Sequence, residues 1–166
     1  MKSRQRSETV RPARWDKLDD NPIHDSYRPT VKFHEPTACE VCGAVYMNGR
    51  WRWAAAPDNA DLVTCPACRR IHDQVPAGQV ELSGTFLREH QDEIMALIRH
   101  HEEKMKSEHP LERIMAVTTH EDGVTVTTTG SHLARDIGEA LKRAFQGHME
   151  MGSATAESML RVIWSR

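Results

Sequence analysis

Two Cys-x-x-Cys pairs constrain this chain more than any other feature of its sequence. The first pair is Cys39 and Cys42, and the second is Cys65 and Cys68. Two thiolates on one tight turn can bind a metal ion from one side, and two such turns complete the tetrahedral shell of Zn²⁺, with bonds of about 2.3 Å. The spacing therefore predicts Zn²⁺ as the cofactor. Because an all-cysteine shell leaves no open coordination position, we expect the ion to stabilise the fold and not to act in catalysis.

Other arrangements also use four cysteines. They are two disulfides, a rubredoxin-like iron centre and a redox-active pair, while His72, just after Cys68, is the nearest rival ligand. Disulfides are rare in the reducing cytosol. The sequence has neither a signal peptide nor an apolar run near the roughly 20 residues that span a bilayer. We therefore expect a cytoplasmic protein that does not enter a membrane, and we favour zinc.

Composition divides the chain into four expected parts. Residues 1–36 hold four prolines, many charges and few bulky apolar side chains, so we expect an extended or disordered basic arm. Residues 37–79 should form a zinc ribbon, in which Asn48-Gly49 is a strong signal for a β-hairpin turn. Residues 80–110 should form a connecting amphipathic helix, and residues 111–166 an α+β module.

Periodic patterns predict the elements of the last two parts. One long helix is expected over residues 85–108, with Pro110 ending it. Beyond it, two β-branched runs separated by HEDG predict an antiparallel hairpin, followed by a second helix and a closing strand. The residues that set the spacing are Leu87, Ile94, Ile98, His101 and Met105 in the first helix, Leu133, Ile137, Leu141 and Phe145 in the second, and Leu160, Val162 and Trp164 in the strand. The expected fold class is α+β: a four-cysteine zinc ribbon joined by a long helix to a small β-β-α-β module, with an extended N-terminal arm.

Basic and aromatic residues gather around the cysteine pairs, although the formal charge of the whole chain is only −2. This total argues against a protein that coats nucleic acid with its whole surface, so any contact should be local. In the strand expected after the hairpin turn, Arg50 and Arg52 share one face and Trp51 and Trp53 the other. The tryptophans could form the small core of the ribbon, with the arginines solvated. Alternatively, the strand could bind RNA phosphates and stack on unpaired bases, and both can hold at once.

The start of the second helix is a further candidate site. His132 and Arg135 lie in its first turn, where free N–H groups and the helix dipole favour an anion such as phosphate, although an ordinary capped helix start explains the same residues. Arg69 and Arg70 add charge beside the second cysteine pair. The expected RNA contacts are Arg4, Arg6, Arg11, Arg14, Trp15, Arg50, Trp51, Arg52, Trp53, Arg69, Arg70, His132 and Arg135.

The sequence contains no motif typical of a catalytic site. We find no Gly-x-Ser-x-Gly, no phosphate-binding loop and no dinucleotide fingerprint. The histidines also lack the His-Glu-x-x-His spacing of a catalytic zinc site. We therefore expect a protein that is not an enzyme.

The segments CEVCG, CPACRR and VTVTTTGSHLARDIGEALKRAFQG resemble small bacterial zinc-ribbon proteins of unassigned activity. More distantly, they resemble the adaptor family for nuclear export of large ribosomal subunits, first named for nonsense-mediated decay, which archaea also possess. The resemblance covers about residues 37–166 and implies that the four cysteines are structural zinc ligands and that the large ribosomal subunit is the partner. Because this chain lacks that family's further cysteine pairs and domains, the resemblance implies a ribosome-facing module and not the export role.

These observations lead to one principal hypothesis and two alternatives. The principal hypothesis is a cytoplasmic zinc-ribbon protein that binds the ribosome or ribosomal RNA and acts in ribosome assembly, quality control, or dormancy (hibernation) under stress. The first alternative is a protein–protein adaptor that docks a protein partner on the helix at residues 85–108. The second is a transcription regulator that uses the ribbon on DNA, which would need a recognition helix with a basic face.

Overall fold

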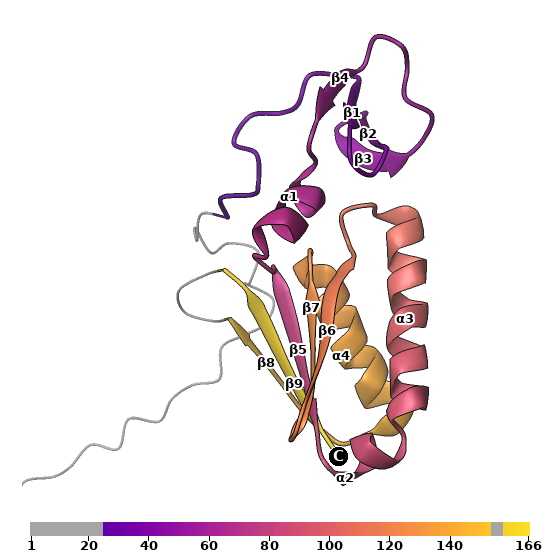
Figure 1. The fold of residues 1–166 in the computed structure, drawn as a ribbon, viewed down its shortest axis with the longest axis vertical. Helices are drawn as coiled ribbons and strands as arrows, with labels where there is room; N and C mark the ends of the chain where they lie inside the picture. Colours follow the sequence, from indigo (N-terminus) through magenta and orange to yellow (C-terminus); the bar gives the residue numbers. More distant parts are fainter. Residues whose placement is uncertain (1–24, 154–157) are drawn as a thin grey trace, which may run out of the picture.

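The computed structural model describes residues 25–153 and 158–166, which form two modules (Figure 1). In this part of the chain there are two β-sheets and four helices, so the expected mixed α+β class is confirmed. Each module has its own cluster of buried apolar residues. Five of the predicted RNA contacts lie outside the described residues: Arg4, Arg6, Arg11, Arg14 and Trp15.

The smaller module contains a four-stranded sheet with the strand order β3-β2-β1-β4. Its strands are β1 (Thr37–Cys39), β2 (Ala44–Met47), β3 (Arg50–Trp53) and β4 (Asp61–Val63). The first three strands pair antiparallel, and β4 pairs with β1 in parallel. The β2–β3 hairpin turns at Asn48 and Gly49, whose φ angles of 53° and 75° are the positive values that a two-residue type I′ turn requires. The hairpin predicted at Asn48-Gly49 is therefore confirmed.

The second cysteine pair begins helix α1 (Pro66–Asp73) instead of lying on a turn between strands. Cys65 is the N-cap, and its sulfur accepts a hydrogen bond from the backbone N–H of Cys68 at 3.4 Å. Pro66 lies in the first turn of α1, where its fixed φ and missing N–H are both tolerated. The module expected to be a ribbon therefore has one cysteine pair between two strands and the other at the start of a helix.

The larger module contains a five-stranded sheet with the order β6-β7-β5-β9-β8. Its strands are β5 (Gly78–Ser83), β6 (Ile114–His120), β7 (Gly123–Thr128), β8 (His148–Ser153) and β9 (Leu160–Ser165). The β6–β7 hairpin and the last strand agree with the sequence prediction, and Leu160, Val162 and Trp164 of β9 are buried on one face. The central strand β5 was not predicted. It pairs antiparallel with β7 and parallel with β9, so the expected β-β-α-β module gains a strand from before the long helix.

Three helices complete the larger module: α2 (Thr85–Glu89), α3 (Gln91–Glu108) and α4 (Ser131–Phe145). The single long helix predicted from Thr85 is interrupted at His90, whose φ and ψ of −125° and 26° are not helical. Helix α4 packs on the sheet, and α3 packs on α4. Ile94 and Ile98 of α3 are fully buried in this core, as are Leu133 and Leu141 of α4. The apolar stripe of α3 is thus used inside the molecule.

The two modules meet near one end of α3 (Figure 1). The indole Nε1 of Trp53, at the end of β3, donates a hydrogen bond to the carbonyl of Lys106 on α3 at 2.7 Å.

No helix among the described residues is long and apolar enough to cross a membrane.

Candidate metal centre and adjoining cleft

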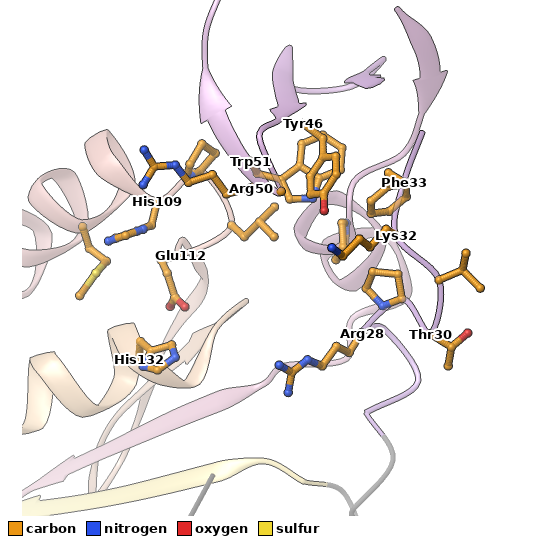
Figure 2. A pocket seen from close by; sticks show the side chains of 17 residues that line it. Arg28, Thr30, Lys32, Phe33, Tyr46, Arg50, Trp51, His109, Glu112 and His132 are labelled. Atoms are coloured by element: carbon orange, nitrogen blue, oxygen red, sulfur yellow. The ribbon is translucent and has the colours of Figure 1, made fainter. Parts of the chain in front are cut away.

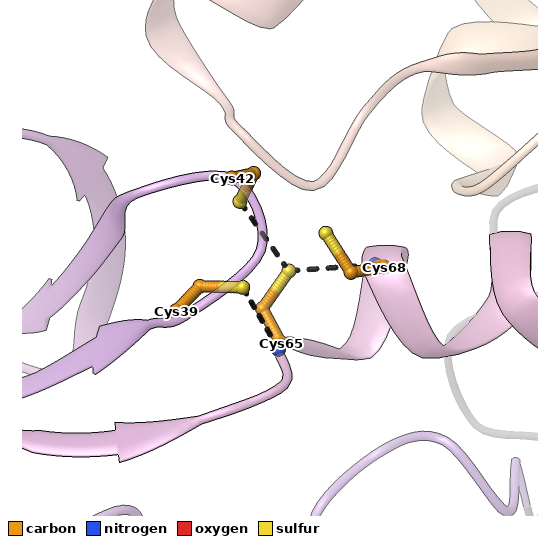
Figure 3. A group of neighbouring side chains, drawn as sticks. All are labelled: Cys39, Cys42, Cys65 and Cys68. Atoms are coloured by element: carbon orange, nitrogen blue, oxygen red, sulfur yellow. Dashed lines mark hydrogen bonds between the residues drawn. The ribbon is translucent and has the colours of Figure 1, made fainter.

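The four cysteine sulfurs converge on one point between β1, β2 and α1 (Figure 3). All four Sγ atoms lie within 4.8 Å of one another, and the sulfurs of Cys42 and Cys65 are 3.8 Å apart. A tetrahedron with metal–sulfur bonds of about 2.3 Å has edges of about 3.8 Å. A disulfide bond would instead need about 2.05 Å, and all four thiols are free. The geometry therefore fits four thiolates around one metal ion, and it excludes the two-disulfide alternative for this conformation.

Local backbone geometry points these sulfurs inward. Gly43 follows the first pair with φ of 78°, a conformation that favours glycine, and its N–H closes a turn on the carbonyl of Cys39 at 2.9 Å. The sulfur of Cys39 accepts the backbone N–H of Cys65 at 3.3 Å. Backbone N–H donors of this kind stabilise a thiolate, so the fold prepares the site for a cation.

The pKa values of three of the four thiols are shifted, and the shifts have opposite signs. Burial favours the neutral thiol of Cys39, but the backbone N–H groups of Cys65, Cys42 and Val41 outweigh it and lower the pKa to about 6. Burial raises the pKa of Cys42 and of Cys65 above the ordinary thiol value, and nearby sulfur charge raises both further. Four thiolates in one buried cluster repel one another, and a bound metal ion removes this conflict because it displaces the protons.

Arg113 also contacts the cluster, and no motif in the sequence predicts this contact. It lies between α3 and β6, and its Nη2 donates to the sulfurs of Cys68 at 3.3 Å and Cys65 at 3.6 Å. Burial acts to lower the pKa of Arg113, but the hydrogen bond and the charge of Cys68 outweigh it and raise the pKa above its usual value. A cation from the larger module is thus held against two sulfurs of the smaller one.

His72 is not a ligand in this arrangement. Its side chain is 87% exposed and pairs with the carboxylate of Asp73 at 2.9 Å. The cluster of candidate metal ligands in the described residues consists of the four cysteines alone.

The two tryptophans of β3 both make intramolecular contacts. Trp51 is only 9% exposed and packs against Phe33 and Tyr46, with ring centroids 5.3 and 5.6 Å away. The expectation that tryptophan forms the small core is therefore correct for Trp51, which has little free surface for stacking on a base. Trp53 is 40% exposed and is anchored to α3 through its indole nitrogen.

The predicted basic contacts are not equally accessible. Arg50 and Arg69 are exposed, whereas Arg52 is half-buried and reaches the carbonyl of Met47 at 3.4 Å. Arg70 is only 7% exposed, because it pairs with Asp25, donates to the carbonyl of Val75 and lies 4.4 Å from the centroid of the Tyr27 ring. The prediction that Arg70 contacts phosphate is therefore corrected, because its guanidinium is buried and bonded inside the protein.

The predicted anion site at the start of α4 is already filled by a carboxylate. Oε2 of Glu112 accepts the backbone N–H of Leu133 at 2.9 Å, and a Cβ on Gly130 would collide with that carboxylate. An external phosphate would have to displace Glu112, so the prediction of a phosphate site there is corrected. His132 remains exposed, while Arg135 is half-buried and lines a smaller pocket beside β8.

A cleft of about 970 Å³ lies between the two modules (Figure 2). One wall is formed by the chain from Arg28 to Phe33 together with β2 and β3, and the other by the end of α3, the loop after it and His132. Figure 2 shows His109, Glu112 and His132 on the side of the larger module, across from the Tyr46 and Phe33 side. The lining residues that carry charge, can gain it, or are aromatic are Arg28, Lys32, Arg50, His109, His132, Glu112, Phe33, Tyr46 and Trp51. Of the predicted contacts, the cleft thus brings together Arg50, Trp51 and His132, whereas sequence reasoning missed Arg28, Lys32 and His109.

Comparison with protein-family models, with curated proteins and with solved structures found no match for this chain.

Proposed function

We propose that this chain is a zinc-stabilised, non-enzymatic RNA-binding protein that takes single-stranded RNA into the cleft between its modules. The metal would be Zn²⁺ in a ribbon-type site of four cysteines, because four clustered thiolates, three of them buried, suit that ion. The partner would be ribosomal RNA or the ribosome, most simply its large subunit, in the cytoplasm. A role in assembly, quality control or dormancy under stress belongs to the same proposal.

The composition of the cleft carries the proposal. Arg28, Lys32 and Arg50 are exposed at its edge, where guanidinium and ammonium groups can meet phosphates. In the wall between them Tyr46 and Trp51 are buried and Phe33 is half-buried, so Phe33 is the ring against which an unpaired base would pack. Glu112 is the one carboxylate among the described lining residues, and one of its oxygens is occupied by α4. Cations beside an aromatic wall are the usual features of a single-stranded RNA site.

The two alternatives are supported less well. An adaptor that docks a protein on residues 85–108 would need a free apolar stripe, but Leu87, Ile94 and Ile98 are buried in the larger module. A DNA-reading regulator would need a helix with a basic face, and α3 alternates acidic and basic residues in QDEIMALIRHHEEKMKSE.

Binding of a labelled single-stranded RNA of about 12 nucleotides tests the proposal, measured by fluorescence anisotropy over a salt series. Three phosphate contacts in a single strand give a slope of log K against log salt of about −2. The triple variant Arg28→Gln, Lys32→Gln, Arg50→Gln should lose most of this slope and most of the affinity. The matched control Arg88→Gln, Lys104→Gln, Arg143→Gln removes the same charge from exposed helix positions that do not line the cleft. Equal losses in the two triple variants would contradict the assignment of RNA to the cleft.

Sedimentation of cell extracts tests the ribosomal partner. At low salt the wild-type protein should travel with ribosomal particles, and the cleft variant should stay with free proteins. A wild-type protein that binds RNA in solution but never sediments with ribosomes would point to another RNA.

A further inference from the structure

The loop after α3 touches the metal cluster, the cleft and α4 at once. Within residues 110–113, Leu111 packs against the cysteine cluster and also lines the cleft. Glu112 lines the cleft and caps α4 through the N–H of Leu133, while Arg113 binds the sulfurs. Thr129 fixes the loop from the other side, because its Oγ1 donates to the carbonyl of Leu111 at 2.6 Å. One short segment therefore links the position of the metal site to the shape of the cleft.

The guanidinium of Arg113 is held by the sulfurs, while the backbone N–H and carbonyl of Arg113 bond to Thr129. The guanidinium is half-buried, and its Nε has no hydrogen-bond partner in the described part of the chain. Its side-chain hydrogen bonds go through Nη2 to Cys65 and Cys68. Zn²⁺ held by four thiolates has a formal charge of −2, which strongly favours an adjacent cation. A cluster without the ion offers no fixed dianion, so a half-buried guanidinium would gain more from water.

We propose that metal occupancy of the four-cysteine cluster controls the cleft through Arg113. When the cluster is loaded, Arg113 holds the 110–113 loop in place, so Glu112 caps α4 and the cleft is formed. When the ion is removed, the side chain of Arg113 is released, the loop keeps only its bonds to Thr129, and Glu112 is no longer held firmly against α4 and the cleft. The effect on RNA rests on the proposed function, whereas the link between metal, Arg113 and loop does not.

Amide hydrogen exchange on the full-length protein tests the link without RNA. The N–H of Leu133 reports the loop directly, because its acceptor is the carboxylate of Glu112. In zinc-loaded wild-type protein this amide should be protected, and titration with a chelator should speed its exchange by about tenfold or more as zinc leaves. Amides of β5, at the centre of the larger sheet, should stay protected and show that the core remains folded.

The variant Arg113→Met separates the arginine from the ion. It keeps a long side chain but removes the charge, so we expect fast exchange at Leu133 even with full zinc content by elemental analysis, and an RNA affinity about tenfold lower. Arg113→Lys should restore part of the protection of the Leu133 amide and part of the RNA affinity. The matched control Arg161→Met removes an arginine that pairs with Glu81 on the larger sheet, and it should leave the exchange rate of Leu133 and the RNA affinity unchanged.

Two results would overturn the proposal. They are a Leu133 amide that stays protected when wild-type protein loses zinc, and a zinc-loaded Arg113→Met variant with wild-type exchange and RNA affinity. The first result holds even if the variant fails to fold. If exchange responds as expected but the wild-type protein binds no RNA, the link is correct and the proposed function is wrong.

Discussion

Replacing Glu112 with glutamine should lower the stability of the protein and raise its RNA affinity. Helix α4 has Gly130 as its N-cap, which offers no side chain to the free N–H groups of the first turn. The carboxylate of Glu112 supplies the missing acceptor from another part of the chain, at 2.9 Å from the nitrogen of Leu133. The same carboxylate is the one negatively charged group among the described residues that line the cleft.

The structure allows the loss of stability to be estimated. A hydrogen bond to a charged group contributes about 1.5–3 kcal/mol, and a negative charge at a helix N-terminus contributes about 0.3–1 kcal/mol. Glu112→Gln keeps an acceptor of the same shape but loses the charge, so the free energy of unfolding should fall by about 1 kcal/mol. Glu112→Ala also loses the acceptor and should lower it by about 2 kcal/mol.

RNA affinity should respond the other way in Glu112→Gln. Removing the carboxylate removes repulsion of phosphate beside Arg28, Lys32 and Arg50, so affinity should rise by about threefold, or about 0.6 kcal/mol. Glu112→Ala is not expected to show this gain, because it also releases the start of α4.

Urea unfolding with zinc in excess, together with RNA anisotropy on the same samples, measures both effects. The control is Glu103→Gln, at an exposed position of α3, and it should stay within about 0.5 kcal/mol of wild type. A Glu112→Gln variant as stable as wild type would refute the capping role. A variant with lowered stability and also lowered affinity would show that the loop position matters more for RNA than the charge does.

Three further predictions concern the metal and the core. Zinc binding to metal-free protein at pH 7 should release at least two protons, because the raised pKa values of Cys42 and Cys65 keep these thiols protonated, whereas Cys39, with its pKa of about 6, is already largely ionised. Calorimetry in buffers of different ionisation enthalpy counts the released protons, and release of none would contradict these assignments. Gly138→Ala should lower the free energy of unfolding by about 1–3 kcal/mol despite the better helix propensity of alanine, because the new Cβ would lie 2.6 Å from Cγ1 of buried Val162. The control is Gly152→Ala, whose Cβ would have no atom within 4 Å, and it should be nearly neutral in the same urea experiment. Trp53→Phe should cost about 1 kcal/mol, because it removes the hydrogen bond to Lys106 that joins the modules; the loss should vanish when the unfolding of the larger module is followed alone.

Features set by nearby residues could be predicted from the sequence. The β2–β3 hairpin depends on two turn residues, Asn48 and Gly49, that favour positive φ. The stripe of Leu133, Ile137 and Leu141 is set by helical spacing alone, and all three are buried. The cysteine cluster follows from two short spacings and from the chemistry of thiolates, so the four candidate ligands were also found.

Features set by distant partners could not be predicted. Strand β5 has only Val80 and Leu82 as large apolar residues, and it is a strand because β7 and β9 flank it on both sides. The interruption between α2 and α3 at His90 has no proline or glycine beside it that would predict the end of a helix. Arg70 was expected at the surface because nothing local shows that Asp25 packs against it.

The adjacent residues Glu112 and Arg113 contact two different sites that the fold brings to either side of one loop. Successive side chains of an extended segment point to opposite sides, so one short loop can serve two sites of opposite electrical sign. Glu112 meets the positive end of α4, and Arg113 meets the negative sulfurs of the metal cluster. Only the charge of Arg113 depends on docking of the modules, because Cys68 belongs to the smaller module, whereas Glu112 and Leu133 both belong to the larger one. Exchanging the two residues would place like charges together at both sites, so the double variant Glu112→Arg, Arg113→Glu should undock the modules even though composition and net charge are unchanged.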